Sequence, residues 1–233
     1  MKVEIWSEVV CPWCYIGKRR FENALSRFPH ADEVAVTWRS FELDPTTSAT
    51  DIDLVGHLAA KYRVSREEAA AMNDRVTGIA AGEGLAFKLD IARRGNTFDA
   101  HRLVHLAAER GKQGEMKEAL LSAYQTQGES IADHAALIRV AVSAGLDEGE
   151  VAGMLAGDAY ASEVRADERE ARELGVSGVP FFVFDRRYGV AGAQPADVLL
   201  EILQKAWDER SPVRVLPGGE DACGPEGCGP PKT

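Results

Sequence analysis

The decisive stretch of the sequence reads Val3-Glu4-Ile5-Trp6-Ser7-Glu8-Val9-Val10-Cys11-Pro12-Trp13-Cys14. Residues 3–8 alternate apolar and polar side chains, as a strand with one buried face does, and the alternation then breaks off. Pro12 suits the first position of a helix, where its missing N–H needs no partner, and residues 13–28 supply the rest of that helix before Pro29. We therefore expect a strand that leads into a helix, with two cysteines at the junction.

This placement of the two cysteines favours redox chemistry. A thiol at the N-terminus of a helix lies near unpaired backbone N–H groups and the positive end of the helix dipole, which favour the thiolate. We expect Cys11 to be the attacking sulfur. Cys14 lies three residues later, on the same side of the first turn, and can attack a mixed disulfide formed at Cys11. Two buried, unreactive thiols are the alternative.

The rest of the chain predicts an α/β fold that is split by a long helical segment. Residues 34–43 alternate as a second strand, and Ala, Glu, Arg, Leu and Met dominate residues 51–174. The remaining elements expected are strands at 181–184 and 188–191, joined by a turn at 185–187, and a helix over 195–207. We assign residues 1–48 and 175–210 to a discontinuous core domain, 49–174 to an all-helical insertion, and 211–233 to a flexible tail.

Composition excludes several classes of function. The chain has 37 acidic and 27 basic residues, a formal charge of −10, and no basic block that could follow a phosphate backbone, so nucleic acid is not an expected partner. No apolar run is long enough to span a membrane. The first residues show neither a charged leader nor an apolar signal core, so we expect the protein to remain in the cytoplasm.

A second motif agrees with the first. Gly178-Val179-Pro180 precedes the strand at 181–184, and the Val179–Pro180 bond there can be cis or trans. Cys-Pro-Trp-Cys after the first strand, a large helical insertion and Gly-Val-Pro before the third strand together resemble the DsbA family of the thioredoxin superfamily. The runs at 11–18 and 96–102 resemble its cytosolic FrnE-like branch.

The resemblance implies a thioredoxin-like fold and thiol–disulfide oxidoreductase or protein disulfide isomerase activity with no bound cofactor. It further implies that Pro180 is cis and lies against the Cys11–Cys14 turn, with the backbone of Val179 open to an extended substrate segment. Expected partners are protein or small-molecule thiols and disulfides, with glutathione as one possible source of electrons. The oligomeric state stays open.

Four other residues are candidates with competing interpretations. Trp13 can offer an apolar platform to substrate, or it can pack against the insertion. Glu8 can influence the thiols or relay a proton, although a solvated carboxylate at the end of a strand is the favoured interpretation. Asn96 and His101 belong to the family-like run, and His101 can titrate near neutral pH. A helix cap and a partly buried helix residue explain these two equally well.

Cys223 and Cys228 lie in the tail and permit a separate hypothesis. About 12 residues separate Ser211 from Cys223, enough chain to extend roughly 40 Å. The tail pair can form its own disulfide or exchange electrons with Cys11 and Cys14, or it can remain reduced and idle. A zinc site built from all four thiolates is disfavoured because a helix begins between the first two, and the histidines show no metal-binding spacing.

The leading functional hypothesis is therefore a thiol–disulfide oxidoreductase or disulfide isomerase. The alternative is a glutathione-dependent isomerase of small aromatic molecules, because the related 2-hydroxychromene-2-carboxylate isomerases share the fold implied by the resemblance. Those relatives typically carry serine at the position of Cys11, so two retained cysteines favour redox chemistry. A non-catalytic zinc-binding or interaction protein is the third class.

Overall fold

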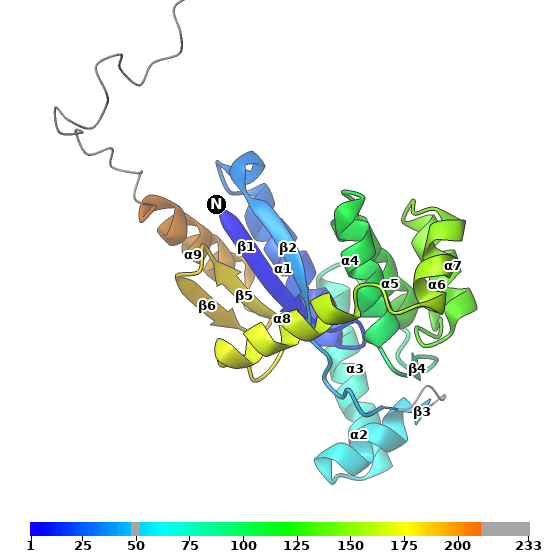
Figure 1. Cartoon of the computed structure of the whole chain (residues 1–233). Helices are drawn as coiled ribbons and strands as arrows, with labels where there is room; N and C mark the ends of the chain where they lie inside the picture. Colours follow the sequence, from blue (N-terminus) through cyan, green and yellow to red (C-terminus); the bar gives the residue numbers. More distant parts are fainter. Residues whose placement is uncertain (48–51, 211–233) are drawn as a thin grey trace, which may run out of the picture.

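The computed structural model describes residues 1–47 and 52–210 of the chain. A four-stranded sheet carries three flanking helices, and further helices lie beyond one end of the sheet (Figure 1). The elements of the sheet layer are β1 (Lys2–Ser7), α1 (Pro12–Ser26), a 3-10 turn (Ala31–Glu33), β2 (Ala35–Ser40), β5 (Phe181–Phe184), β6 (Tyr188–Ala191) and α9 (Ala196–Asp208). The predicted order of strands and helices is confirmed.

The sheet has the order β2-β1-β5-β6. β1 pairs in parallel with β2, placing Ile5 beside Trp38, and pairs antiparallel with β5, placing Ile5 beside Phe182. β5 and β6 form the expected hairpin. The central strand β1 therefore has a neighbour on both edges, and its C-terminal end delivers the chain to the cysteines.

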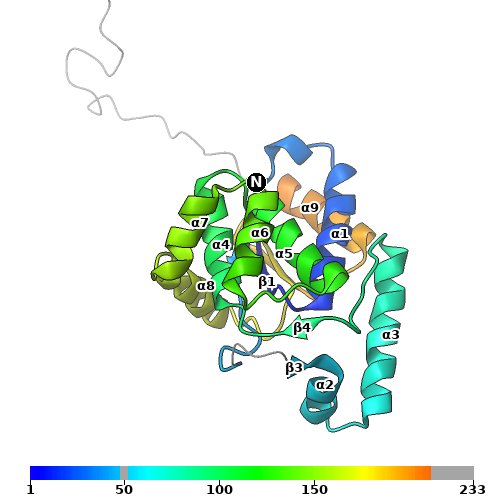
Figure 2. The ribbon, with the colours of Figure 1, turned by 90° about the vertical axis from the view of Figure 1, so that its right-hand side faces the viewer.

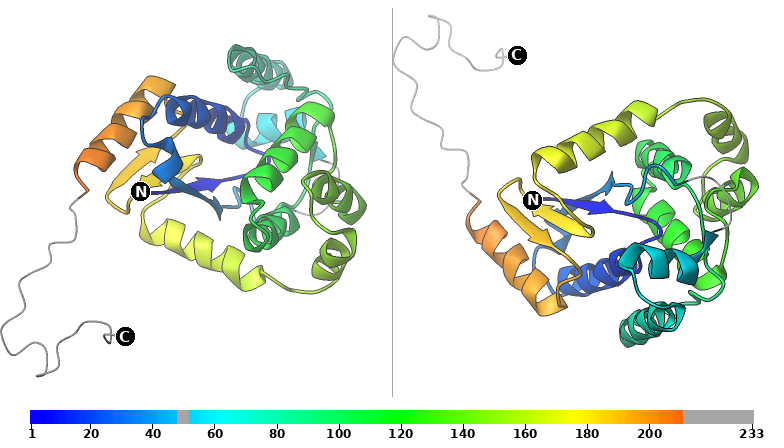
Figure 3. Two further views of the ribbon diagram at one scale, coloured as in Figure 1. Left: turned by 90° about the horizontal axis from the view of Figure 1, so that it is seen from above. Right: turned by 90° about the horizontal axis from the view of Figure 1, so that it is seen from below.

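The two faces of the sheet are covered by different helices, as Figure 3 shows from above and below. α1 and α9 cover one face, where Val3 and Ile5 join the main core. α8 (Ala161–Glu173) lies on the other face, where Trp6 packs with Ala171 and Val183. The alternation of β1 thus divides its side chains between two cores, because successive side chains of a strand point to opposite faces.

The segment between β2 and α8 is mostly helical. Its elements are α2 (Leu54–Tyr62), α3 (Arg66–Gly82), α4 (Phe98–Glu109), α5 (Gln113–Gln127), α6 (His134–Ser143) and α7 (Glu148–Ala156), with β3 (Ile52–Asp53) and β4 (Arg93–Arg94) paired antiparallel. The β3–β4 pair differs from the all-helical prediction, since strands of two residues leave no periodic pattern to detect. Figure 2 shows α2 and α3 standing apart from α4–α7.

Local hydrogen bonds mark where several elements begin and end. A capping box joins Ser65 and Glu68 at the start of α3, and Asp147 caps α7 through the N–H of Glu150. β2 ends at Ser40, earlier than the predicted strand 34–43. The chain turns away there because the N–H of Leu43 donates to the carboxylate of Glu8 at 3.0 Å.

None of the helices within the described residues is both long and apolar enough to cross a membrane. Cys223, Cys228 and the predicted tail lie outside the described residues.

Candidate active site

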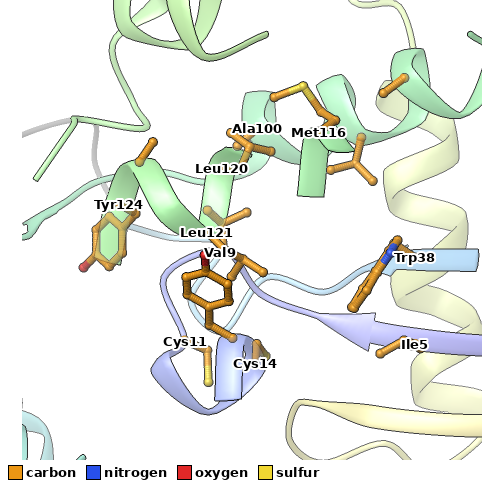
Figure 4. Packing of buried hydrophobic residues seen from close by; sticks show 14 of the residues in the cluster. Ile5, Val9, Cys11, Cys14, Trp38, Ala100, Met116, Leu120, Leu121 and Tyr124 are labelled. Atoms are coloured by element: carbon orange, nitrogen blue, oxygen red, sulfur yellow. The ribbon is translucent and has the colours of Figure 1, made fainter. Parts of the chain in front are cut away.

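Cys11 and Cys14 lie where β1 gives way to α1 (Figure 4). Cys11 is the N-cap residue of α1 and has extended backbone angles, and Pro12 begins the helix as expected. The N–H of Cys14 donates to the carbonyl of Cys11 at 3.0 Å, which closes the first turn. Cys11 keeps 7% of its surface exposed while Cys14 is fully buried, so an external disulfide meets Cys11 first.

The surroundings give the two thiols opposite acidities. The pKa of Cys11 is lowered, mainly by the hydrogen bond from the Cys14 thiol and also by the backbone N–H groups of Cys14 and Trp13, against burial and the charge of Glu8. The pKa of Cys14 is raised well above its ordinary value by burial first and by Cys11 second. The pair is therefore asymmetric, with an ionisable outer sulfur and a protonated inner one.

The loop before β5 lies directly against this pair. The Val179–Pro180 peptide is cis, and the carbonyl oxygen of Val179 is 3.7 Å from the sulfur of Cys11. Pro180 is buried against α1 at Gly17, where an added Cβ would lie 2.7 Å from Cγ of Pro180. Glycine at position 17 thus permits the close approach of the proline loop to the helix that carries the cysteines.

Glu8 is a buried residue, and the solvated carboxylate favoured from the sequence is wrong. Its side chain is about 1% exposed, and Oε1 accepts from the N–H of Val9 at 2.6 Å and lies 3.2 Å from Nε2 of His101. Oε2 accepts from the N–H of Leu43 and from the hydroxyl of Thr97 at 3.2 Å. The pKa of Glu8 is lowered despite burial, since the contacts with His101 and the N–H of Leu43 stabilise its charge.

The two candidates from the family-like run separate in space. His101 is buried in α4 and contacts Glu8, whose backbone N–H in turn donates to the sulfur of Cys14. Asn96 binds the carbonyl of Thr47 and accepts from the N–H of Phe98, so it orders the loop before α4. Among the described residues, its hydrogen bonds do not reach the cysteines.

Lys117 of α5 is a functional candidate that the sequence reasoning missed. Its side chain is 1% exposed, and Nζ donates to the carbonyl of Ser7 at 3.1 Å. Burial lowers the pKa of Lys117 to about 8, although Cys14 and Glu8 act in the opposite direction. A signal was present, because position 117 shares the i+3, i+4 and i+7 spacing of the apolar residues Leu120, Leu121 and Tyr124.

A cavity of about 320 Å³ opens between the cysteine turn and the helices α2 and α3. Trp13, 42% exposed, lines this cavity together with residues of α2 and α3. The basic or potentially basic lining residues are His57, Lys61, Arg75 and Arg94, and the apolar ones include Leu43, Leu54, Leu58, Tyr62, Met72, Val76 and Leu89. The cavity therefore combines apolar walls with cationic groups that can hold an anion.

In the described part of the chain, no group of three or more His, Cys, Asp or Glu side chains is placed to hold a metal ion. The four-thiolate zinc alternative also needs Cys223 and Cys228, which lie beyond the described residues.

The chain is similar in fold to several proteins of known structure. A crystal structure of a probable DsbA oxidoreductase from Streptomyces coelicolor is 50% identical and superimposes with a TM-score of 0.90, covering 100% of both chains. The cytosolic disulfide reductase DsbM from Pseudomonas aeruginosa, solved with GSH, is 16% identical with a TM-score of 0.62 over 89% of this chain and 100% of that one. A 2-hydroxychromene-2-carboxylate isomerase is 14% identical with a TM-score of 0.65, covering 89% and 95%.

The model of the family described as the DSBA-like thioredoxin domain matches residues 2–204, which include the cysteine turn, the insertion and the proline loop. The chain therefore belongs to the DSBA-like thioredoxin domain family and is a thiol–disulfide oxidoreductase.

Proposed function

We propose that Cys11 is the nucleophile and Cys14 the resolving thiol of this oxidoreductase, and that its substrates are protein or small-molecule disulfides and thiols. The opposite pKa shifts of the two sulfurs carry this proposal. The sulfur whose pKa is lowered attacks, and a buried thiol whose pKa is raised cannot compete with it for an incoming disulfide.

The exchange has two steps in the reducing direction. The Cys11 thiolate attacks one sulfur of a substrate disulfide, forming a mixed disulfide and expelling the other substrate sulfur as a thiolate. Cys14 then loses its proton and attacks the sulfur of Cys11, which forms the Cys11–Cys14 disulfide and releases the second substrate thiolate. Two electrons pass from the protein to the substrate, and the reverse sequence oxidises a dithiol.

Val179, Pro180 and Trp13 are the proposed substrate contacts. The carbonyl of Val179 lies beside Cys11, and the cis bond to Pro180 fixes that edge of the loop next to the reactive sulfur. An extended substrate segment can hydrogen-bond to such an exposed backbone edge. Trp13 is 42% exposed and lines the same cavity as Cys11, so it offers an apolar surface there.

The cavity beside Cys11 supports glutathione as a source of electrons. Glutathione is an anionic thiol, and the cavity places Lys61, Arg75 and Arg94 within one molecule's reach of Cys11. The relative solved with GSH is called a cytosolic disulfide reductase, which supports a reducing role and a cytoplasmic location for this chain also. Assignment to the FrnE-like branch belongs to the same proposal.

The glutathione-dependent isomerase remains the alternative, supported by the shared fold of the 2-hydroxychromene-2-carboxylate isomerase. A pair of neighbouring thiols with opposite acidities favours redox exchange, because isomerisation of an aromatic substrate needs no resolving sulfur. The participation of Cys223 and Cys228 in turnover is a further part of the proposal, tested by changing both to serine.

Insulin reduction and refolding of scrambled ribonuclease, compared between the parent and Cys11→Ser, test the proposal. We expect the substitution to lower both rates at least about a hundredfold, since a hydroxyl at neutral pH is not ionised. Cys14→Ser is the matched control and should still form the mixed disulfide, which mass spectrometry detects. Undiminished activity of Cys11→Ser would overturn the assignment, and isomerase turnover by that variant would favour the alternative.

A further inference from the structure

The described residues place one buried cation close to the resolving cysteine without a carboxylate partner of its own. Lys117 reaches from α5 to the carbonyl of Ser7 at the end of β1. It forms no salt bridge within the described residues, and its ammonium group lies 5.8 Å from the centre of the Trp38 ring. An ammonium group with a single carbonyl acceptor is costly to bury, so its retention at this point requires an explanation.

The peptide between Ser7 and Glu8 connects Lys117 to Cys14. Lys117 donates to the carbonyl of that peptide, and the N–H of the same peptide, on Glu8, donates to the sulfur of Cys14 at 3.3 Å. A cation on the carbonyl side polarises the peptide and strengthens its N–H as a donor. Stronger donation to a sulfur stabilises the thiolate relative to the thiol.

We infer that Lys117 is a positioning residue for the second step of the exchange, and that its ammonium group, acting through the Ser7–Glu8 peptide, promotes ionisation of Cys14 when the mixed disulfide is resolved. This inference rests on the proposed roles of the two cysteines. The opposing influences are burial of Cys14 and the negative charge that Cys11 carries as a thiolate. That charge disappears once Cys11 is bound to substrate, so the effect of Lys117 is greatest at the step that needs it.

The charged and titratable groups that face Lys117 come from two directions. Glu8 and the N-cap residue Cys11 lie on the loop after β1, and Cys14 and Lys18 lie on α1. The face toward β2 carries the neutral ring of Trp38. Lys18 has its own partners in Glu22 and Glu118, whereas the carboxylate of Glu8 is held by His101 and the N–H of Leu43. The positive charge of Lys117 therefore acts on the sulfur of Cys14 as well as on Glu8.

Two substitutions separate the charge from the hydrogen bond. Lys117→Met removes both and fits an apolar surround, and Lys117→Gln keeps a donor toward Ser7 but carries no charge. Gln125→Met is the matched control, since Gln125 is a buried residue of the same helix that donates to the neighbouring carbonyl of Val9 at 3.4 Å. Removing an unpaired buried charge should not lower the stability of the fold.

The experiment measures the two steps separately between pH 6 and 10. A Cys14→Ser background reports attack by Cys11 alone, and rapid quenching of the full pair with a disulfide peptide reports resolution. In both Lys117 variants we expect resolution at pH 7 to slow about tenfold, equivalent to a rise of about one unit in the pKa of Cys14, while attack by Cys11 changes less than about twofold. Above about pH 8, where Lys117 itself loses its proton, the difference from the parent should shrink.

The outcomes distinguish the two proposals. Lys117→Gln resolving at the parent's rate would overturn the role of the charge, and so would equal slowing of both steps with a lower melting temperature, which is the pattern of a structural residue. The Gln125→Met control should match the parent in both steps. A parent protein that exchanges no disulfide would instead overturn the proposed function on which the inference rests.

Discussion

Two buried glutamates, Glu4 within β1 and Glu8 just past its end, are held by different kinds of contact. Glu4, on the sheet face toward α8, contacts Arg39, Arg186 and Lys2, and these cations lower its pKa to about 2 against the effect of burial. Glu8, just past the end of β1, is bound by backbone N–H groups, a hydroxyl and one histidine. Both side chains are about 1% exposed, so burial alone does not distinguish them.

The difference determines which of the two carboxylates influences the cysteines. Around Glu4, positive and negative groups cancel within one cluster that ties β1 to β2 and to the turn after β5. Around Glu8, backbone N–H groups, a hydroxyl and His101 hold the carboxylate, whose negative charge acts to raise the pKa of Cys11, while the charge of Lys117 acts to lower the pKa of Cys14. Ion pairs around Glu4 hold β1 to its neighbours, whereas the charges of Glu8 and Lys117 act on the sulfurs of Cys11 and Cys14.

The largest expected effect follows from Glu8→Gln. Two of the four donors around Glu8 would then meet an amide NH₂ group, so we expect a loss of about 3–5 kcal/mol in the free energy of unfolding. In the molecules that remain folded, the pKa of Cys11 should fall because the opposing charge is gone. Urea unfolding measures the first effect, and the pH dependence of iodoacetamide alkylation measures the second.

The control for this variant is Thr97→Val, which removes one neutral donor and leaves the carboxylate charged. The pH dependence of Cys11 alkylation in this variant should match that of the parent. A Glu8→Gln protein whose Cys11 titrates at or above the parent's pH would contradict the comparison.

Glu4→Gln should have a smaller effect, confined to stability. Arg39 and Arg186 are partly exposed and can rehydrate, so we expect a loss of about 1–3 kcal/mol at pH 7. A folded-state pKa of about 2 lies below the unfolded value of 4.5, so the Glu4 carboxylate stabilises the fold above pH 4.5 and loses that contribution as the pH falls toward 2. The variant should therefore differ from the parent at pH 7 and converge with it in acid.

Disulfide exchange per folded molecule provides the second test of Glu4→Gln, because its cluster faces away from the cysteines. We expect the rate to stay within about twofold of the parent. A large loss of exchange in fully folded Glu4→Gln would show that the two ends of β1 are coupled.

The fold, and the position of the two cysteines at the start of α1, could be predicted because their signals are local. The change of period at Cys11, the proline that begins α1 and the Gly-Val-Pro run each occupy a few adjacent residues. The roles assigned to Cys11, Cys14, Val179, Pro180 and Trp13 stay predictions, although the structure brings the last three beside Cys11.

The environment of the cysteines could not be predicted in the same way. Glu8 is buried because α4 supplies His101 and Thr97, and Lys117 is buried because α5 lies across the end of β1. These contacts join residues about 90 to 110 positions apart, so a local pattern can mark Lys117 as buried but cannot identify its partner. The end of β2 at Ser40 has the same origin, since the carboxylate of Glu8 binds the N–H of Leu43.

Glu42 offers an intermediate case and the smallest expected effect. It is buried like Glu4 and Glu8, but its one cation, Arg165, is shared with Glu168, and its Oε1 has no partner in the described part of the chain. Burial, together with the contact to Glu168, raises its pKa to about 7.

An acid whose pKa is raised on folding favours the fold fully below its unfolded value of 4.5, and that advantage is lost as the pH rises through 7. Glu42→Gln should consequently be more stable than the parent by about 1 kcal/mol at pH 8, after allowance for the partial exposure of Arg165, with no gain at pH 4. Urea unfolding at the two pH values checks this prediction. If Glu42→Gln were instead less stable than the parent at pH 8, the ion pair with Arg165 would stabilise the fold, as the ion pairs of Glu4 do.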